Sequence, residues 1–349
     1  MFDINTALSY PLLILLSIGK KSFENLGIFI NRSGDTISRL LNPASVSFCC
    51  MQEISREVFR DKKRLFFIID DTLIKKMYSR FMQGSGWFFD TKIGRRIMAY
   101  RLIFGVLSDG KFVIPIESAY LFSKELIDEM EKKPLTKEEI TQAMIMLVQR
   151  LFPKTKIIVL ADGLYATKNF LTWCINNAIA AEMRMHSNRV VIYKGKKITL
   201  KKLLDEKGIR PKGRQMARTI SALWHGLNLQ ITVVRRLDKH GDESVVFQVA
   251  TYKALPREHL ANYAKRWPIE SVIRTCKQYL GLQDCFSRSL EVQQNHVASV
   301  LFAYALAQLE MKHYKLKTPE AAIRQLKMKN IDVLKQKFTD LYNVFEAYV

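Results

Sequence analysis

Leu65-Phe66-Phe67-Ile68-Ile69-Asp70-Asp71 is a run of five apolar residues followed by two acids. A short, continuous apolar run is typical of a strand that is buried on both faces of a sheet. Ile157-Ile158-Val159-Leu160-Ala161-Asp162 repeats the pattern further along the chain. At the carboxyl ends of strands in α/β folds, side chains emerge at the crevice where ligands bind. The sequence therefore predicts an α/β fold with these acids in a common site.

The residues around the two strands predict a mixed architecture. Residues 101–107 and 112–116 are apolar and are joined by Ser-Asp-Gly-Lys at 108–111, which is a hairpin signal. A helix that extends to Arg150 is expected to restart at the cap Thr-Lys-Glu-Glu at 136–139. A helix from about 167 to 177, a strand near 180–185 and helices from 256 onward are also expected, among them 296–312 and 319–327.

Residues 188–252 have a different sequence pattern. Strand-like segments at 190–193, 229–234 and 245–250 are separated by stretches rich in Lys, Arg and Gly. We interpret this block as a β-rich insertion.

Residues 1–60 are predicted to be helical, with a break and an N-cap at 31–36 before the helical segment 37–41. Short helices joined by a small polar turn suit a helix-turn-helix that reads DNA. A small helical packing domain explains the same pattern equally well, and the sequence does not decide between the two.

The charge of the chain is strongly basic. Its 349 residues include 55 Lys and Arg against 33 Asp and Glu, which gives a net charge of +22. Such an excess favours a nucleic-acid partner, because basic side chains that neutralise phosphates release condensed counterions. Five scattered cysteines without a Cys-x-x-Cys pair argue against a zinc site or disulfide framework and for a reducing cytosol. The apolar run 12–18 is much shorter than the roughly 20 residues of a membrane span, so we expect no membrane association.

Carboxylates from two neighbouring strands and a helix can together hold a pair of Mg²⁺ ions, which prefer oxygen ligands. Two such ions can activate an attacking hydroxyl and stabilise the leaving oxygen in phosphodiester displacement. A single aspartate at a strand end is more often a loop or helix cap, so the interpretation depends on the whole set. Asp70 and Asp71 point to opposite faces of a strand, and only one of them can face the site.

The third acid is expected from residues 263–277. Tyr263, Arg266, Glu270 and Lys277 are separated by 3, 4 and 7 residues, which places them on one helical face. A metal ligand among phosphate-binding groups would look like this, but so would a solvated, salt-bridged helix face. Pro268 must kink the helix or begin a new one, which would put Glu270 in the first turn of the second piece.

These residues resemble a known family. The order Tyr, two residues, Arg, three residues, Glu, six residues, Lys is similar to the signature of the insertion-sequence-four group of DDE transposases. The segments Ile-Ile-Asp70-Asp71-Thr72 and Ala-Asp162-Gly163-Leu164-Tyr165 resemble the two aspartate motifs of that group, although Leu164 stands where a small residue is usual. The resemblance covers roughly residues 64–315, and the Asp-any-Thr arrangement favours Asp70 over Asp71.

The resemblance implies an α/β, RNase H-like catalytic core with a β-rich insertion, preceded by a small helical DNA-binding domain. The expected parts are a helical domain at 1–62, the first part of the core at 63–187, the insertion at 188–252, the second part of the core at 253–315 and a C-terminal helical region at 316–349.

The resemblance also implies the activity: Mg²⁺-dependent cleavage of transposon ends and their joining to target DNA. Asp70, Asp162 and Glu270 would bind two Mg²⁺ ions, for which Mn²⁺ can substitute. Tyr263, Arg266 and Lys277 would contact phosphates near the cut. The expected partner is double-stranded DNA with terminal inverted repeats, bound by a homodimer in a synaptic complex, in the bacterial cytoplasm at the nucleoid.

Two further predictions concern DNA contacts. Trp224 of the insertion is a candidate for stacking on an unpaired base, against the alternative that it packs in the core of the insertion itself. Basic tracts at 194–197, 201–202 and 210–218 are candidates for contacts along the DNA backbone.

The alternatives are a catalytically inactive, DNA-binding relative of a transposase and a nuclease with the same core. Retention of all three acids together with Tyr263, Arg266 and Lys277 disfavours the inactive relative. The six histidines lack metal-ligand spacing, and no Ser/His/Asp, Cys/His or phosphate-loop pattern offers other chemistry.

Overall fold

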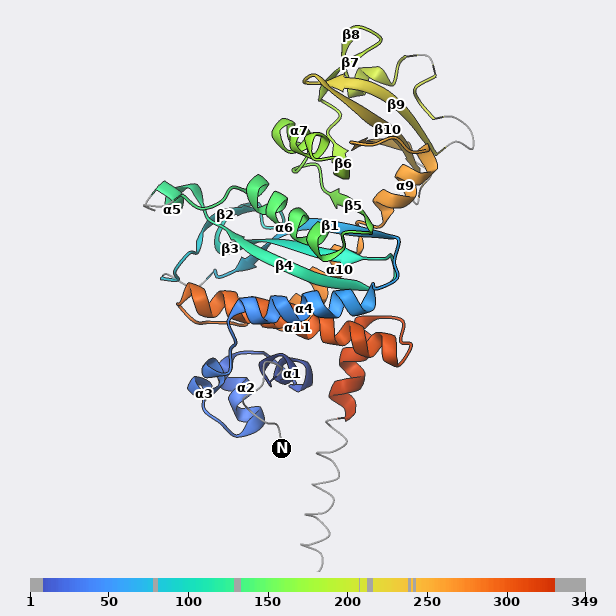
Figure 1. Ribbon diagram of the computed structural model, residues 1–349. Coiled ribbons are helices and arrows are strands. Elements are labelled where there is room, and N and C mark those ends of the chain that lie inside the picture. Colours follow the sequence, from blue (N-terminus) through green and yellow to red (C-terminus); the bar gives the residue numbers. More distant parts are fainter. Residues whose placement is uncertain are drawn as a thin grey trace, which may run out of the picture.

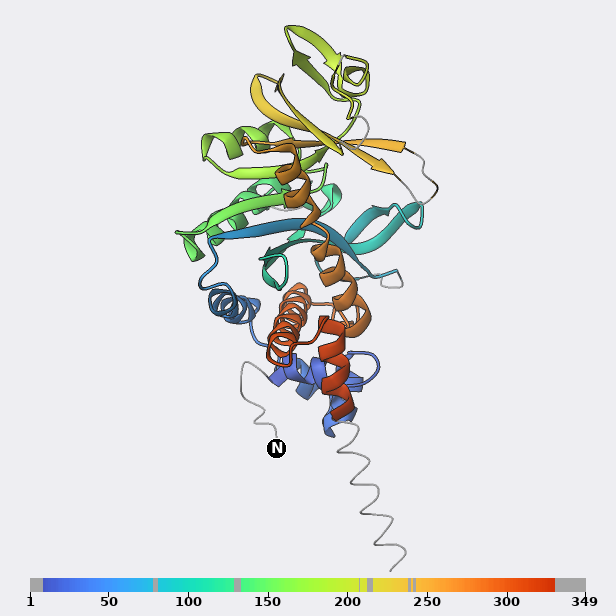
Figure 2. The same ribbon diagram turned by 90° about the vertical axis from the view of Figure 1, so that its right-hand side faces the viewer.

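A computed structural model gives the fold of the chain (Figure 1). The structure describes residues 9–77, 81–128, 133–206, 208–211, 216–237, 240 and 243–329. In both views the described part is elongated: helices lie at one end, the strands β7 to β10 at the other, and the central sheet between them (Figures 1 and 2).

Within the described residues, eleven strands form one sheet. Its first half contains β1 (Arg64–Lys75), β2 (Gly86–Asp90), β3 (Arg95–Ser108), β4 (Val113–Leu121), β5 (Lys156–Ala161) and β6 (Ala180–Met185). β1, β3 and β4 form an antiparallel meander, and β5 and β6 continue the sheet parallel to β1. This strand order is that of an RNase H-like core, as the sequence led us to expect.

β1 is longer than the sequence predicted. Its first residues are buried on both faces, and Phe67, Ile68 and Ile69 have no exposed surface. We expected the strand to end at the acids, but it continues to Lys75 because residues 66–75 all pair with β3. Asp70 and Asp71 therefore lie within a strand, where their backbone is fixed on one side by the ladder.

The second half of the sheet contains β7 (Val190–Tyr193), β8 (Lys196–Thr199), β9 (Ala217–Trp224), β10 (Leu227–Leu237) and β11 (Glu243–Ala250), with the short helix α8 (Leu200–Leu203). The three strand-like segments expected here are confirmed as β7, β10 and β11. β9 lies where we expected only a loop. β11 pairs with β6, so these strands extend the core sheet directly.

Helices cover both faces of the core sheet. α6 (Lys137–Leu151), which begins at the expected capping box of Thr136 and Glu139, and α7 (Lys168–Asn176) lie on one side. α4 (Ala44–Val58) and α11 (Leu290–His313) pack against each other and against β4 on the other side (Figure 1). The short helix α5 (Lys124–Asp128) follows β4.

The N-terminal helices are α1 (Ser9–Leu16), α2 (Phe23–Ile30) and α3 (Gly34–Arg39). The expected break between helices is confirmed: Asn31 ends α2 in the left-handed conformation, and the side chain of Ser33 caps α3. α1 packs on α11, where the Tyr10 hydroxyl lies 2.8 Å from Nδ1 of His296.

Two helices lead from the second half of the sheet back to the core. α9 (Pro256–Ala264) is followed by α10 (Pro268–Tyr279), and residues 319–329 are helical after α11. The predicted interruption at Pro268 is therefore confirmed, with Glu270 in the first turn of α10.

Candidate active site

The pairing of β1 with β5 brings Asp70 beside Asp162. The two strands are parallel, and the pairs run from Arg64 with Lys156 to Ile68 with Leu160. Two residues after Ile68 is Asp70, within β1, and two residues after Leu160 is Asp162, directly past the end of β5. In a parallel pair, residues at the same level point to the same face of the sheet, and both aspartates line one hollow of about 510 Å³.

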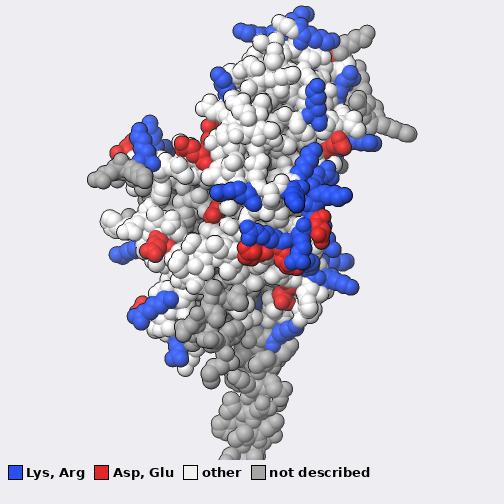
Figure 3. All heavy atoms as spheres, in the orientation of Figure 1, with Lys and Arg blue, Asp and Glu red and all other residues white. Residues whose placement is uncertain are grey.

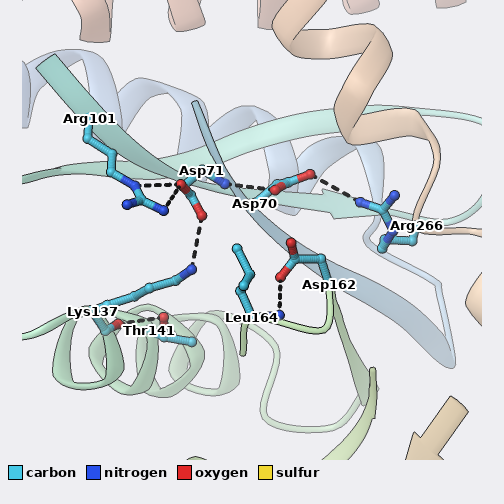
Figure 4. A network of polar contacts seen from close by, with 8 residues as sticks. All are labelled: Asp70, Asp71, Arg101, Lys137, Thr141, Asp162, Leu164 and Arg266. Atoms are coloured by element: carbon cyan, nitrogen blue, oxygen red, sulfur yellow. Dashed lines mark hydrogen bonds and ion pairs between the residues drawn. The ribbon is translucent and has the colours of Figure 1, made fainter. Parts of the chain in front are cut away.

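Asp71 faces the other way and is fully paired (Figure 4). Its Oδ2 accepts a hydrogen bond from Nε of Arg101 at 2.7 Å, and its Oδ1 accepts one from Nζ of Lys137 at 2.9 Å. Burial raises the pKa of this carboxyl, but the two cations more than offset burial and hold the pKa below its ordinary value. Asp71 thus takes part in an ion-pair network that links β1, β3 and α6.

Asp70 has a different environment. Its Oδ1 accepts the backbone N–H of Asp71 at 2.9 Å, and its Oδ2 lies 3.1 Å from Nη1 of Arg266. Burial raises its pKa to about 6, and the nearby charges of Asp162 and Asp71 add to the rise. A carboxylate in this position gains stability from any further cation placed beside it.

Arg266, between α9 and α10, joins the third acid to this pair. Its Nη1 contacts Asp70, while its Nη2 donates to Oε1 of Glu270. One guanidinium thus bridges a strand acid and a helix acid that are far apart in the sequence. Asp162 instead accepts the backbone N–H of Leu164 at 2.8 Å (Figure 4).

Tyr263 and Lys277, the other two residues of the Tyr-Arg-Glu-Lys set, form hydrogen bonds with β5 and β1. The Tyr263 hydroxyl donates to the carbonyl of Ala161, at 3.3 Å, immediately before Asp162. Nζ of Lys277 donates to Oγ1 of Thr72 at 2.7 Å and to the carbonyl of Leu73 at 2.9 Å. Burial and the charges of nearby lysines lower the pKa of Lys277 to about 8.

Asp70, Asp162 and Glu270 line the same hollow, together with Arg184, His186, Tyr263 and Arg266. In the arrangement that the structure describes, however, no three His, Cys, Asp or Glu side chains within the described ranges are close enough to hold a metal ion together. Arg266 occupies the space between two of the acids. Many of the Lys and Arg side chains on the face drawn in Figure 3 gather beside α9, next to acidic side chains.

Trp224 is buried in the structure. Its side chain is only 2% exposed and belongs to the apolar core of the β7–β11 region. This burial favours the alternative, packing within the insertion, over stacking on an unpaired base. The exposed aromatics near the acids are Trp267 and Phe89, which we did not single out.

The partners of Asp71, Arg101 and Lys137, were not predicted from the sequence. Arg101 stands at the start of an otherwise apolar segment of β3, and this isolated charge was the available signal. Lys137 gave no signal, because a lysine in the first turn of a helix is usually exposed. Of the three expected basic tracts, the one at 210–218 lies partly outside the described residues.

An RNase H-like sheet with one acid on β1 and another directly after the adjacent strand β5 defines a class of enzymes that act on nucleic-acid phosphodiesters. Residues 61–306 match the family described as Transposase DDE domain, so the chain belongs to that family. It is a DNA transposase, and DNA is its substrate. Enzymes of this family generally use divalent metal ions.

Comparison with solved structures agrees on the fold. The piggyBac transposase, in a synaptic complex with hairpin DNA, superposes with a TM-score of 0.51 at 10% sequence identity, over 95% of this chain and 71% of that one. The Mos1 strand transfer complex gives a TM-score of 0.19 at 11% identity, over 46% of this chain and 52% of that one. These last values are too low to compare folds.

A search of curated proteins found no match to the chain. None of the helices in the described ranges is both long enough and apolar enough to cross a membrane.

Proposed function

We propose that Asp70, Asp162 and Glu270 are the catalytic acids of this transposase and that they bind two Mg²⁺ ions. The observation that carries the proposal is the convergence of the three acids on one hollow, two from adjacent strands and one from α10. The Tyr-Arg-Glu-Lys spacing supports placing the chain in the insertion-sequence-four group.

The residues fit a divalent cation. Three carboxylates supply the oxygen ligands that Mg²⁺ prefers. Asp70 and Glu270 already share one positive charge, the Arg266 guanidinium, which marks the place between them as favourable for a cation. Arg266 must turn away from Asp70 for the acids to close around an ion.

Each residue would then have a defined task. The bound ions would supply a metal-activated nucleophile and stabilise charge on the leaving oxygen. Asp70 is held in orientation by the amide of Asp71, and Asp162 by the amide of Leu164. Arg266, once turned from Asp70, carries a guanidinium whose geometry suits two phosphate oxygens. Tyr263 fixes α9 to the end of β5, and Lys277 fixes α10 to β1 beyond Asp70.

Asp71 is not a ligand in this proposal. Its two oxygens are already bound by Arg101 and Lys137, on the face turned from the hollow. Breaking both ion pairs to free it would leave two half-buried cations without a partner.

The substrate we propose is duplex DNA with terminal inverted repeats, bound by a homodimer in a synaptic complex, with helices α1–α3 as a DNA-binding module. The excess of basic residues supports this, as does the synaptic complex with hairpin DNA in which the similar piggyBac protein was solved. A bacterial protein at the nucleoid fits the group to which we assign it.

The test is cleavage and joining of a labelled transposon end in the presence of Mg²⁺ or Mn²⁺. The wild type should cut and join, whereas Asp162→Asn and Glu270→Gln should lose at least about 10³-fold in rate, as expected when a group that stabilises the transition state is removed. Cutting without joining would favour a nuclease. Cleavage that persists in both variants would contradict the proposal.

A further inference from the structure

A second groove also reaches Asp70 and Glu270. It has a volume of about 730 Å³ and shares Asp70 and Glu270 with the hollow described above. Its walls are β1 residues 70–73 and 75, residues 89–92 at the end of β2, and one face of α10. We call it the hairpin groove, because β2 and β3 form a hairpin along one of its sides.

Two exposed aromatic side chains lie on different walls of the hairpin groove. Phe89, on β2, is 60% exposed, and Trp267, at the start of α10, is 62% exposed. Large apolar side chains on a soluble surface are normally scattered singly. Two aromatics beside a catalytic centre offer flat faces on which the bases of an unpaired strand can stack.

Cations complete the lining. Lys92, Arg274 and Lys277 all face the hairpin groove, and none of the three forms an ion pair with an acid of the described residues. Lys277 instead donates to Thr72 and to a backbone carbonyl. The charges of Lys92 and Arg274 are available to phosphates, and such contacts would follow the backbone of a strand.

The turn that presents Phe89 and Lys92 is already ordered. Oδ1 of Asp90 accepts the backbone N–H groups of Lys92 at 2.8 Å and Ile93 at 3.1 Å, and Oδ2 pairs with Lys75 of β1. The hairpin is thereby fixed to the strand that carries Asp70. Binding of a strand here would therefore cost the protein little conformational entropy.

We propose that the hairpin groove binds the DNA that lies beyond the cut: the flanking DNA before cleavage and the target DNA during joining. The proposal rests on the catalytic roles proposed for Asp70 and Glu270. DNA must extend in both directions from a phosphate held at these acids, and two grooves leave them. Flanking and target sequences change with every insertion, so their site must tolerate any sequence, as stacking and phosphate contacts do.

The other groove suits the transposon side. It is lined by Arg184, His186 and Ser187, whose donors and acceptors can read base edges. A fixed terminal sequence is recognised by such groups, whereas the hairpin groove differs in presenting the two exposed rings of Phe89 and Trp267 beside the cations Lys92 and Arg274.

The test uses transposon-end duplexes whose flank is a single-stranded extension with 2-aminopurine at its first nucleotide, bound to the full chain in Ca²⁺ to prevent cleavage. Stacking should quench the fluorescence in the wild type. Phe89→Ala should restore it and weaken binding about tenfold for ends that carry a flank, but less than twofold for pre-cut ends. Trp87→Ala is the matched control, because Trp87 is 54% exposed on the same strand but does not line the groove.

A second pair of variants tests the charge. Lys92→Ala should reduce the salt dependence of binding by about one phosphate contact for flanked ends only. Arg95→Ala, an exposed cation on the same hairpin outside the groove, should leave it unchanged. Equal effects of the two variants would overturn the proposal.

Unchanged quenching in Phe89→Ala, or an equal loss of affinity for flanked and pre-cut ends, would also overturn it. If fluorescence is quenched only when the 2-aminopurine is placed on the transposon side of the cut, the assignment of the two grooves is reversed. These failures are distinct from failure of the catalytic proposal, which shows as cleavage by Asp162→Asn whatever the probe reports.

Discussion

At the scale of single residues, the neighbours Asp70 and Asp71 show how a strand separates two identical side chains. Alternation along β1 sends one carboxylate to the hollow and the other to Arg101 and Lys137. The sequence could predict that only one of them faces the site, but the choice depended on a family resemblance. The ion pairs with Arg101 and Lys137 supply a physical reason for the same choice.

The two acids should therefore respond differently to the same substitution. We expect Asp70→Asn to abolish cleavage with a change of less than about 1 kcal/mol in the free energy of unfolding, because it removes a charge that burial disfavours. Asp71→Asn should retain cleavage within about tenfold but lose about 1–3 kcal/mol of stability, because two cations lose their partner. Urea denaturation and an end-cleavage assay measure the two effects. The reverse pattern would assign the catalytic role to Asp71.

At the scale of elements, a buried network attaches α9 to the sheet. Glu182 of β6 is 1% exposed and accepts hydrogen bonds from Nδ1 of His259 at 2.8 Å and from the hydroxyl of Tyr252. Asn262 donates to that hydroxyl at 3.0 Å. Because Tyr263 and Arg266 follow directly, this network helps to place the helical side of the site against Asp162.

Glu182→Leu should destabilise the protein by about 3 kcal/mol, because His259, Tyr252 and Asn262 would lose a buried acceptor. The matched control is Gln248→Leu on the neighbouring strand β11. Gln248 is also buried, and its Oε1 has no hydrogen-bond partner among the described residues, so its replacement should change the unfolding free energy by less than about 1 kcal/mol. Similar losses in both variants would show that burial alone, without the network, sets the stability.

The contact between α1 and α11 should depend on pH. Nε2 of His296 donates to the carbonyl of Gly281 at 3.0 Å, so the neutral ring accepts the Tyr10 hydroxyl at Nδ1. Burial lowers the pKa of His296 to about 4, from 6.5, and the nearby Lys76 adds to this, against Gly281 and Asp284, which raise it. Between these two values the unfolded chain binds more protons than the folded protein, so stability falls as the pH is lowered.

The free energy of unfolding of the wild type should therefore fall by about 2 kcal/mol between about pH 6.5 and pH 5. Binding of one full proton changes it by about 1.36 kcal/mol for each pH unit. Above about pH 6.5 this contribution is constant. His296→Gln should remove this part of the slope in urea denaturation curves recorded across the range. If the variant keeps the full slope of the wild type, His296 is not the group responsible.

Most elements of the core could be predicted from the sequence, because their patterns are local. The cap of α6, the hairpin turn between β3 and β4 and the break at Pro268 all depend on a few adjacent residues. The continuation of β1 to Lys75 and the strand β9 could not, because pairing partners far along the chain determine them. The hairpin groove is likewise a product of tertiary contacts, and its aromatics gave no signal that distinguishes them from core residues.

At the scale of the whole molecule, β1, β5 and α10 lie in the middle of an elongated body, with strands β7–β10 at one end and helices α1–α3 at the other (Figures 1 and 2). This arrangement leaves a long surface beside the site for a duplex. With a net charge of +22, the surface should bind DNA mainly through phosphates.

We therefore expect the affinity for an end duplex to fall by about 10³-fold between roughly 50 and 200 mM salt, as for proteins with about six phosphate contacts. Fluorescence anisotropy measures this directly. A decrease of less than about tenfold would mean that the basic residues are solvated surface without a role in binding.

The central claim, that Asp70, Asp162 and Glu270 together hold divalent cations, is tested most directly by anomalous diffraction from crystals of the protein with end DNA and Mn²⁺. We expect manganese peaks at about 2.1 Å from carboxylate oxygens of all three residues, with Arg266 turned away from Asp70. Peaks elsewhere, on Asp71 for example, or none between the three acids in a fully bound complex, would contradict the account.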